Sequence, residues 1–211
     1  MLKCPCTNVK TALQQIQPNI NMKTTKQLYE IAEVRMGYNV RGRVEEVADG
    51  AVQMLQMKDL NDAVLPADAV LIRTEVGARA ESAQIHAGDI IIRTRGASNK
   101  TTFIAEEPEL PTILASPLML IRVAEGCRVN PAYLSWLLNQ DSTQEMLAGV
   151  SAYGTTIPML NKKTLETLSL EIHPEEQQEQ ILKIGTLARE IRELTHELAD
   201  AQHRYVSALL S

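Results

Sequence analysis

The chain has 211 residues, of which 45% are hydrophobic, and a formal net charge of −5 at pH 7. A chain of this length can bury one good hydrophobic core, and its three cysteines, Cys4, Cys6 and Cys127, are too few for a disulfide framework and predict a reducing, cytoplasmic location. No apolar run approaches the roughly 18 residues that cross a membrane, so we expect no membrane association.

The negative charge is unevenly distributed along the chain. Residues 1–130 contain 15 Lys and Arg and 15 Asp and Glu, so their charges cancel. Residues 131–211 contain 6 and 11, which accounts for the whole −5 (6 − 11). The first part of the chain is therefore free to carry a basic face, which permits nucleic-acid binding without demonstrating it.

The chain begins with a polar segment, residues 1–24, for which we predict a loose tail or a short helix. The first regular element is predicted at residues 28–34, and a polar loop with two glycines follows at residues 37–43. Its candidate DNA-binding side chains are Tyr38, Asn39, Arg41 and Arg43. Such a loop can follow a phosphate backbone, but the tip of a solvated hairpin would have the same composition.

The strands predicted for the body of the chain are short. Residues 51–57 predict one strand, and residues 69–73 and 118–123 predict two more. Long loops and few helices separate them. The sequence therefore predicts an α+β fold, a globular domain of short mixed strands, rather than a doubly wound sheet.

The most informative stretch is His-Ala-Gly-Asp-Ile-Ile-Ile-Arg-Thr-Arg-Gly-Ala-Ser-Asn-Lys at residues 86–100. A Gly-Asp turn enters a β-branched run, and strand alternation then places Arg93 and Arg95 on one face, just before Ser98, Asn99 and Lys100. Arginine binds guanine edges and phosphates with two hydrogen bonds. The pattern favours a nucleic-acid interface, although an edge strand protected by charges would also explain it.

One helix is predicted between the strands, at residues 132–147, with Asn130 and Pro131 at its start. Its expected buried residues are Leu134, Leu137 and Leu138, beside Trp136, the only tryptophan. A loop with two further DNA-binding candidates, Thr155 and Thr156, follows. A short strand at residues 168–172 then leads into the C-terminal segment.

The C-terminal segment, residues 174–211, predicts one long helix, which we call the arm. Its apolar residues recur at alternating steps of three and four, as at the a and d positions of a coiled coil. This apolar seam consists of Ile184, Leu187, Ile191, Leu194, Leu198, Ala201, Tyr205 and Ala208. A helix of about 37 residues would be about 55 Å long, so its own domain cannot cover all of the seam. Gly185 is expected to point outward and to mark a bend.

The alternative for the arm is an amphipathic helix packed along its own domain. If the seam instead needs another helix, the chain pairs with a second copy or with a partner protein.

No pattern for catalysis, a cofactor or a metal accompanies these elements. Cys4-Pro5-Cys6 lacks a second Cys/His pair at ligand spacing. Asn130-Pro131-Ala132-Tyr133 is one residue from the Asn-Pro-Pro-Tyr box of adenine methyltransferases, but no glycine-rich turn for S-adenosylmethionine precedes it. The acidic pattern of a Mg²⁺ nuclease and the common phosphate-loop and hydrolase motifs are missing too. We expect no catalytic residue, no cofactor and no metal.

Several stretches, in their order and spacing, resemble one family. They are residues 88–96, Tyr153-Gly154-Thr155-Thr156-Ile157-Pro158 with Asn161, the strand at residues 165–174 that enters the arm, and Glu176-Gln177 followed by Gln180-Ile181. Over roughly residues 25–210, the chain resembles the specificity (S) subunit of type I restriction-modification systems. The resemblance implies a non-catalytic DNA target-recognition domain at residues 25–173. It also implies a spacer helix at residues 174–211, on which methyltransferase (M) and restriction (R) subunits assemble.

The chain differs from that family in size, because an S subunit usually has two recognition domains and two long helices. A homodimer with antiparallel arms would supply both, and its target in double-stranded DNA would be an inverted repeat around a fixed spacer. The competing interpretation is a coiled-coil adaptor that does not bind DNA. A solitary adenine methyltransferase is a further alternative.

Overall fold

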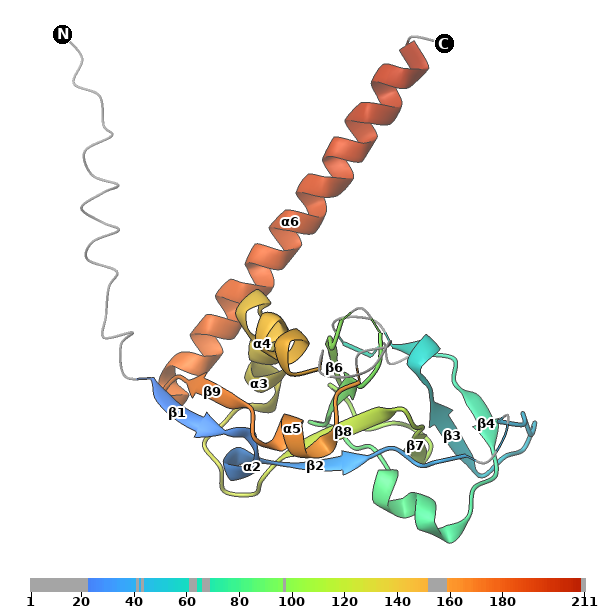
Figure 1. Ribbon diagram of the computed structural model, residues 1–211. Helices are drawn as coiled ribbons and strands as arrows, with labels where there is room; N and C mark the ends of the chain where they lie inside the picture. Colours follow the sequence, from blue (N-terminus) through green and yellow to red (C-terminus); the bar gives the residue numbers. More distant parts are fainter. Residues whose placement is uncertain are drawn as a thin grey trace, which may run out of the picture.

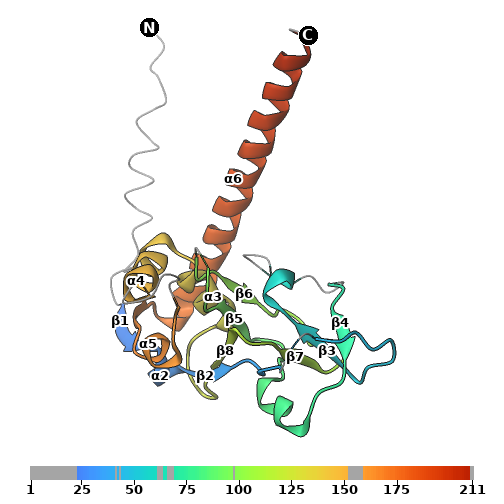
Figure 2. The same cartoon turned by 45° about the vertical axis from the view of Figure 1, so that its right-hand side comes forward.

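A computed structural model describes residues 23–40, 42, 44–60, 64–65, 69–96, 98–151 and 159–209. A body of short strands carries one long C-terminal helix, α6 (Glu175–Leu209), which projects far beyond it (Figures 1 and 2). This arrangement confirms the predicted α+β fold with a long C-terminal helix.

Three small sheets form the body. The largest is an antiparallel sheet in the order β2 (Ala32–Met36), β8 (Leu118–Val123), β5 (Ile90–Arg93) and β6 (Thr101–Phe103). In the second sheet β3 (Val52–Leu55) lies between β4 (Ile72–Thr74) and β7 (Thr112–Leu114), antiparallel to β4 and parallel to β7. The third sheet pairs β1 (Thr24–Gln27) with β9 (Ser169–Ile172).

The helices of the body are short. They are α2 (Leu28–Ile31), α3 (Pro131–Leu138), α4 (Asp141–Ser151), α5 (Lys162–Glu166) and the 3₁₀ helices η1 (Met57–Asp59) and η2 (Ala78–Ala83). Among the described helices, none is long and apolar enough to span a bilayer.

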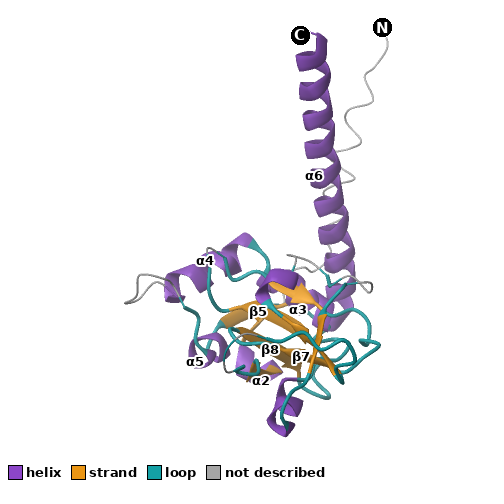
Figure 3. Ribbon diagram, turned by 90° about the vertical axis from the view of Figure 1, so that its right-hand side faces the viewer, coloured by secondary structure: helices purple, strands orange, loops and turns teal. Residues whose placement is uncertain are grey.

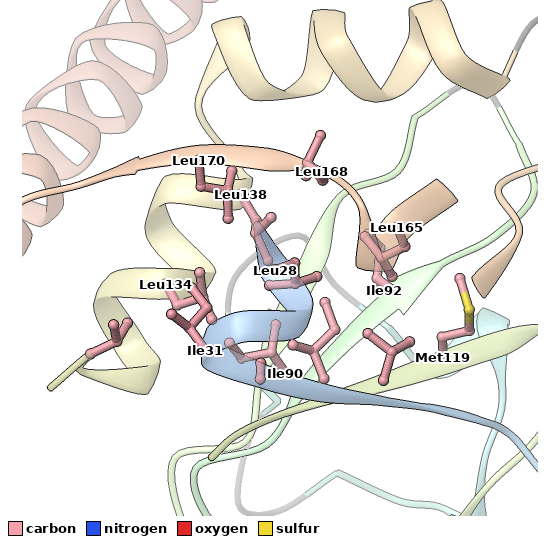
Figure 4. Packing of buried hydrophobic residues seen from close by; sticks show 14 of the residues in the cluster. Leu28, Ile31, Ile90, Ile92, Met119, Leu134, Leu138, Leu165, Leu168 and Leu170 are labelled. Atoms are coloured by element: carbon pink, nitrogen blue, oxygen red, sulfur yellow. The ribbon is translucent and has the colours of Figure 1, made fainter. Parts of the chain in front are cut away.

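The four-stranded sheet is buried on both faces. Ile90 and Ile92 belong to one hydrophobic cluster and Ile91 to another, because successive side chains of a strand point to opposite faces. The first cluster includes Leu28 of α2 and Leu134 of α3, which pack over the sheet (Figure 4). Burial on both faces explains why the Ile-Ile-Ile run shows no polar alternation.

A buried ion pair holds the Gly-Asp turn that precedes β5. Gly88 has a φ of +87°, a conformation that favours glycine. Asp89 is 1% exposed and accepts a 2.6 Å hydrogen bond from the His86 backbone N–H. Arg122 of β8 donates to its two oxygens from Nε and Nη2, each at 2.7 Å, and these bonds raise the pKa of Arg122. The turn is thus tied to the neighbouring strand.

The prediction of one helix over residues 132–147 is wrong, because α3 ends at Leu138 and α4 begins at Asp141. Between them, the side chain of Asn139 pairs with the edge strand β6. Its Oδ1 accepts from the Thr101 N–H at 2.8 Å, and its Nδ2 donates to the Thr101 carbonyl at 2.9 Å. This double hydrogen bond holds the chain at the point where the first helix ends.

The predicted strand at residues 118–123 is confirmed, and the one at residues 168–172 differs by a single residue. Other elements are shorter than predicted: the strand at residues 51–57 is confined to β3, the strand at residues 69–73 is displaced to β4, and residues 28–34 contain α2 followed by β2. Strands β6 and β7 were not predicted, since three residues offer too few alternating positions to be recognised.

Candidate nucleic-acid interface

The loops predicted to contact DNA leave the four-stranded sheet at the same end. Strands β2 and β5 are both antiparallel to β8, so they run in the same direction. Near their ends, Met36 and Ile92 are both register partners of Met119. Because neighbouring strands lie about 4.8 Å apart, the loops at residues 37–43 and 94–100 begin roughly 10 Å from each other.

A third segment reaches the same end of the sheet. Arg95 forms an isolated antiparallel bridge with Met159, and the Leu160 N–H donates to the Thr94 carbonyl at 2.9 Å. Met159 follows the segment that contains the candidates Thr155 and Thr156. Those two residues lie outside the described part of the chain, as do Arg41 and Arg43.

The predicted site residues of the β5–β6 loop differ in exposure. Arg95 is exposed, and Ser98 and Lys100 are half-buried. The half-buried Arg93 donates from Nη2 to the Leu60 carbonyl at 2.8 Å, and Asn99, 8% exposed, donates to the Arg93 carbonyl at 2.8 Å. Arg93 and Asn99 therefore hold the loop together. Arg95 is the exposed cation of this loop.

Two residues missed by sequence reasoning hold this loop from outside. Gln144 of α4 donates from Nε2 to the Asn99 carbonyl at 3.1 Å and to the Leu138 carbonyl at 2.8 Å. Asn139 fixes Thr101, immediately after the loop. In the sequence, Asn139 could have been noticed as a polar residue that follows an apolar run inside a predicted helix. Nothing in the sequence pointed to its partner, 38 residues away.

The loop after β2 borders a cleft of about 1060 Å³. Tyr38 is anchored by its backbone, since its N–H donates to the Leu114 carbonyl at 2.7 Å and its carbonyl accepts from the Ser116 N–H at 2.9 Å. A Cβ at Gly37 would lie 2.7 Å from the Ala115 carbonyl carbon, so this close approach requires glycine. Asn39 is exposed beside Tyr38 in the cleft wall. The second candidate loop therefore adjoins a concave surface.

The predicted dimerisation residues lie on the exposed part of α6. Six of them, Ile184, Leu187, Ile191, Leu194, Leu198 and Tyr205, are between 57% and 68% exposed, and Ala201 is exposed as well. Figure 3 shows this part of the helix standing clear of the body. The structure therefore excludes the alternative in which the seam packs along its own domain.

The apolar seam faces away from the body. Gln178 is 1% exposed, and Gly185 lies against Trp136 of α3, so these two residues mark the face of α6 that contacts the body. Leu187 follows Gln178 by nine residues (187 − 178), and Leu194 follows Gly185 by nine (194 − 185). Nine residues are about two and a half turns at 3.6 residues per turn, so both leucines lie on the face of the helix opposite to the body. The prediction that Gly185 points outward is therefore wrong.

Hydrogen bonds from Gln178 fasten the start of α6 to the body. Its Oε1 accepts from the Asn130 N–H at 2.7 Å. Its Nε2 donates to the Arg128 carbonyl at 3.0 Å and to the His173 carbonyl at 2.9 Å. One buried side chain thus joins the chain entering α3 to the chain entering α6.

Next to it, Tyr133 and His173 form a second link. The Tyr133 hydroxyl accepts from the His173 N–H at 3.2 Å and lies 2.7 Å from His173 Nδ1. The hydroxyl has one proton and two lone pairs, so the tautomer of His173 decides which of the two atoms donates in the second contact. Burial lowers the pKa of His173, and the positive charge of Lys23 lowers it further, while Glu171 opposes the change.

We expect the variant His173→Asn to lose less stability on acidification than the wild type. The folded-state pKa of His173 lies below its unfolded value of about 6.5. The unfolded chain therefore binds the proton more tightly than the folded chain. The stability contribution of neutral His173 is complete above the unfolded pKa and is lost as pH falls through the folded pKa. The asparagine side chain has both a donor and an acceptor for the Tyr133 hydroxyl but does not titrate. Urea denaturation from about pH 8 to about pH 5 measures the difference, and parallel curves would contradict the assignment.

Comparison with known proteins places the chain in a family. The sequence profile described as type I restriction modification DNA specificity domain matches residues 20–198. No curated protein matches the chain. Specificity subunits of this family are non-catalytic, as the sequence predicts.

Solved structures share the fold. A chain from work on complex assembly and conformational transition of the type I R-M system has a TM-score of 0.63 and 16% identity, over 91% of this chain and 46% of that one. The S subunit from M. genitalium has a TM-score of 0.54 and 14% identity, over 87% of this chain and 43% of that one. The HsdS subunit from Thermoanaerobacter tengcongensis has a TM-score of 0.58 and 15% identity, over 89% of this chain and 44% of that one. This chain thus spans less than half the length of each. The profile match covers most of the sequence, so the chain belongs to the family of type I restriction-modification DNA specificity domains.

Proposed function

We propose that this chain is the DNA-reading subunit of a type I restriction-modification system and acts as a homodimer on a bipartite site. Each body reads one half of an inverted repeat. The two arms pair in antiparallel orientation through their apolar seams and keep the half-sites a fixed distance apart. The chain performs no chemistry itself and directs a separate adenine methyltransferase.

The observation that carries the DNA-binding part is that the polar loops after β2 and β5 leave the four-stranded sheet at the same end, where Met159 also pairs with Arg95. In a family of DNA specificity domains, such a cluster of loops is the natural reading surface. On the β5–β6 loop Arg95 is exposed and Lys100 is half-buried, and Asn39 lies on the neighbouring loop. Arginine and lysine suit both phosphates and guanine edges.

The homodimer is supported by the orientation of the seam. Six large side chains more than half exposed on one stripe form a surface that soluble proteins normally cover. Their repeat of three and four is the one that a second helix of the same kind fits. Because the seam points away from the body, a second arm can lie along it without meeting the body.

The opposite face of the arm is the proposed docking surface for the methyltransferase (M) subunit. It is polar, with an ion pair between Arg189 and Glu193 and a contact of 3.3 Å between His196 Nδ1 and the Asp200 carboxylate, each joining residues one helical turn apart. Restriction would require a further, ATP-dependent R subunit.

The test is the double variant Arg95→Glu, Lys100→Glu, which should lose sequence-specific DNA binding. Each lost phosphate contact lowers the slope of log K against log salt by about 0.9, so the two together should flatten it by up to about 1.8. Arg93 is left unchanged because it holds the loop to Leu60. The same variant should fail to direct adenine methylation when mixed with the M subunit of its system.

The matched control is Lys26→Glu, Lys183→Glu, which removes the same charge away from this end of the sheet. Lys26 lies on β1 and Lys183 on α6. Equal losses in both double variants would indicate a general effect of charge. If the wild-type chain binds no DNA at low salt, the adaptor interpretation replaces this proposal.

A further inference from the structure

We infer that the contact between Trp136 and Gly185 is a rigid joint that fixes the angle between body and arm, and thereby sets the spacer between the two half-sites. The inference rests on the proposed function, because a spacer exists only if paired arms hold two DNA-reading bodies. It assigns the choice of spacer to two positioning residues outside both the reading loops and the apolar seam.

The joint leaves no space for a side chain at Gly185. A Cβ there would lie 2.6 Å from Cε2 and 3.1 Å from Cδ1 of Trp136, and closer still to Nε1. Carbon atoms normally approach to about 3.5–4.0 Å. The indole therefore lies directly on the backbone of α6, in a contact that only glycine permits.

The indole cannot easily retreat, because a stack of rings supports it. Trp136 stacks on Tyr133, with centroids 6.0 Å apart and planes at 29°. Tyr133 is fully buried and meets the ring of His173 edge-on, also at 6.0 Å. The stack runs from the segment that enters α6 to the third turn of the helix. Pressure on the indole is therefore transmitted into the core.

Two fixed points define the direction of the arm. Gln178 and Gly185 lie on one face of α6, seven residues apart (185 − 178), which is about 10 Å along the axis. Between them, Ile181 packs against the first hydrophobic cluster. Every described side chain from residue 187 to residue 207 is exposed. The direction of the free part of the arm, about 34 Å long for Leu187–Leu209, is therefore determined at its foot.

The same short helix connects the joint to the reading loop. Trp136 is in the last turn of α3, and Asn139, which caps it, holds the backbone of Thr101 by two hydrogen bonds. Thr101 begins β6, directly after the loop that carries Arg95 and Lys100. A change of angle at Gly185 therefore changes the position of this loop relative to the arm.

Small angles suffice to change the spacer. A tilt of about 10° moves a point about 20 Å from the joint, the scale of a domain of this size, by about 3.5 Å. That displacement is about one base-pair step of 3.4 Å. In a symmetric dimer both bodies move, so the effect on the separation of the half-sites is doubled.

The test is Gly185→Ala in the full chain, with Gly149→Ala as its control. Gly149 is also helical, but a Cβ there meets no atom within 4 Å. Alanine favours both helices, so only the contact with Trp136 distinguishes the two variants. Because Trp136 is the only tryptophan, quenching of its fluorescence by acrylamide reports on the joint. Selection from DNA pools with randomised half-sites and variable spacers reports on spacing.

For Gly185→Ala we expect stronger quenching and a preferred spacer that shifts by at least about one base pair, with the same half-site sequence as the wild type. Gly149→Ala should match the wild type in both measurements. Adding Trp136→Phe to Gly185→Ala should restore the wild-type spacer, because the smaller ring makes room for the methyl group. Restoration by a second substitution distinguishes a joint from a general loss of stability.

Several outcomes would overturn the inference. Unchanged quenching means that the helix accommodates the methyl group without opening the contact. Changed quenching with an unchanged spacer means that the contact exists but does not set the spacing. If the wild-type chain enriches no DNA, the proposed function fails and this inference fails with it. Enrichment of a single half-site without a preferred spacer removes the homodimer, and this inference with it, but leaves DNA reading by the body in place.

Discussion

Replacing both Leu194 and Leu198 with glutamate should convert a dimer of this chain into a folded monomer. Both side chains lie in the middle of the apolar seam and are 64% and 60% exposed. Burial of a leucine contributes about 1.5–3 kcal/mol, and a symmetric dimer would lose four of them. The expected loss of about 6–12 kcal/mol weakens association by more than about 10⁴-fold. Light scattering at tens of micromolar protein gives the masses.

The matched control is Arg192→Glu, His203→Glu, which adds charge to the opposite face of the same helix. Arg192 and His203 follow Gly185 by 7 and 18 residues (192 − 185 and 203 − 185), which are close to two and five full turns of the helix. Both therefore lie on the same face of α6 as Gly185, opposite to the seam. This variant should remain dimeric. A monomeric wild type, or equal behaviour of the two double variants, would show that the seam does not mediate self-association.

Arg122→Met should destabilise the body by about 3 kcal/mol, since it leaves the Asp89 carboxylate without its counterion. Asp89 is 1% exposed, so water cannot replace the two lost hydrogen bonds. The Arg122 side chain is 30% exposed, and for this reason the expected loss lies at the lower end of the range for buried pairs. Urea denaturation measures it as a lower midpoint with an unchanged slope.

A nearby ion pair provides the control for this prediction. On β2, next to Arg122, the side chain of Arg35 contacts Glu33 at 2.6 Å, but Glu33 is 56% exposed. Arg35→Met should therefore cost less than about 1 kcal/mol. Equal losses in the two variants would mean that burial does not determine the strength of these contacts.

Several features of this protein could be predicted from the sequence because they depend on residues close together in the chain. The seam follows from alternating steps of three and four along one helix. Asn130 caps the helix that starts at Pro131, with its Oδ1 accepting from two N–H groups in the first turn. The strand at residues 118–123 follows from a run of buried, β-favouring residues. The order of these local patterns along the chain carried the family resemblance.

The tertiary structure decided how these local elements face one another. Arg93 and Arg95 are equivalent in the sequence pattern, yet the first is bound to the Leu60 carbonyl, 33 residues away, and the second is exposed. Gly185 looked like an outward helix breaker, but Trp136 lies on it. Such contacts join residues from distant segments, and the local periodicity that defines a helix or strand contains no information about which neighbour will cover it.

The direction of the seam shows the same division. The spacing of Leu187 and Leu194 determined that they share a stripe, whatever the fold. Only the packing of Gln178 and Gly185 against α3 decided that this stripe points away from the body, because burial of one helix face leaves the opposite face to solvent or to a partner.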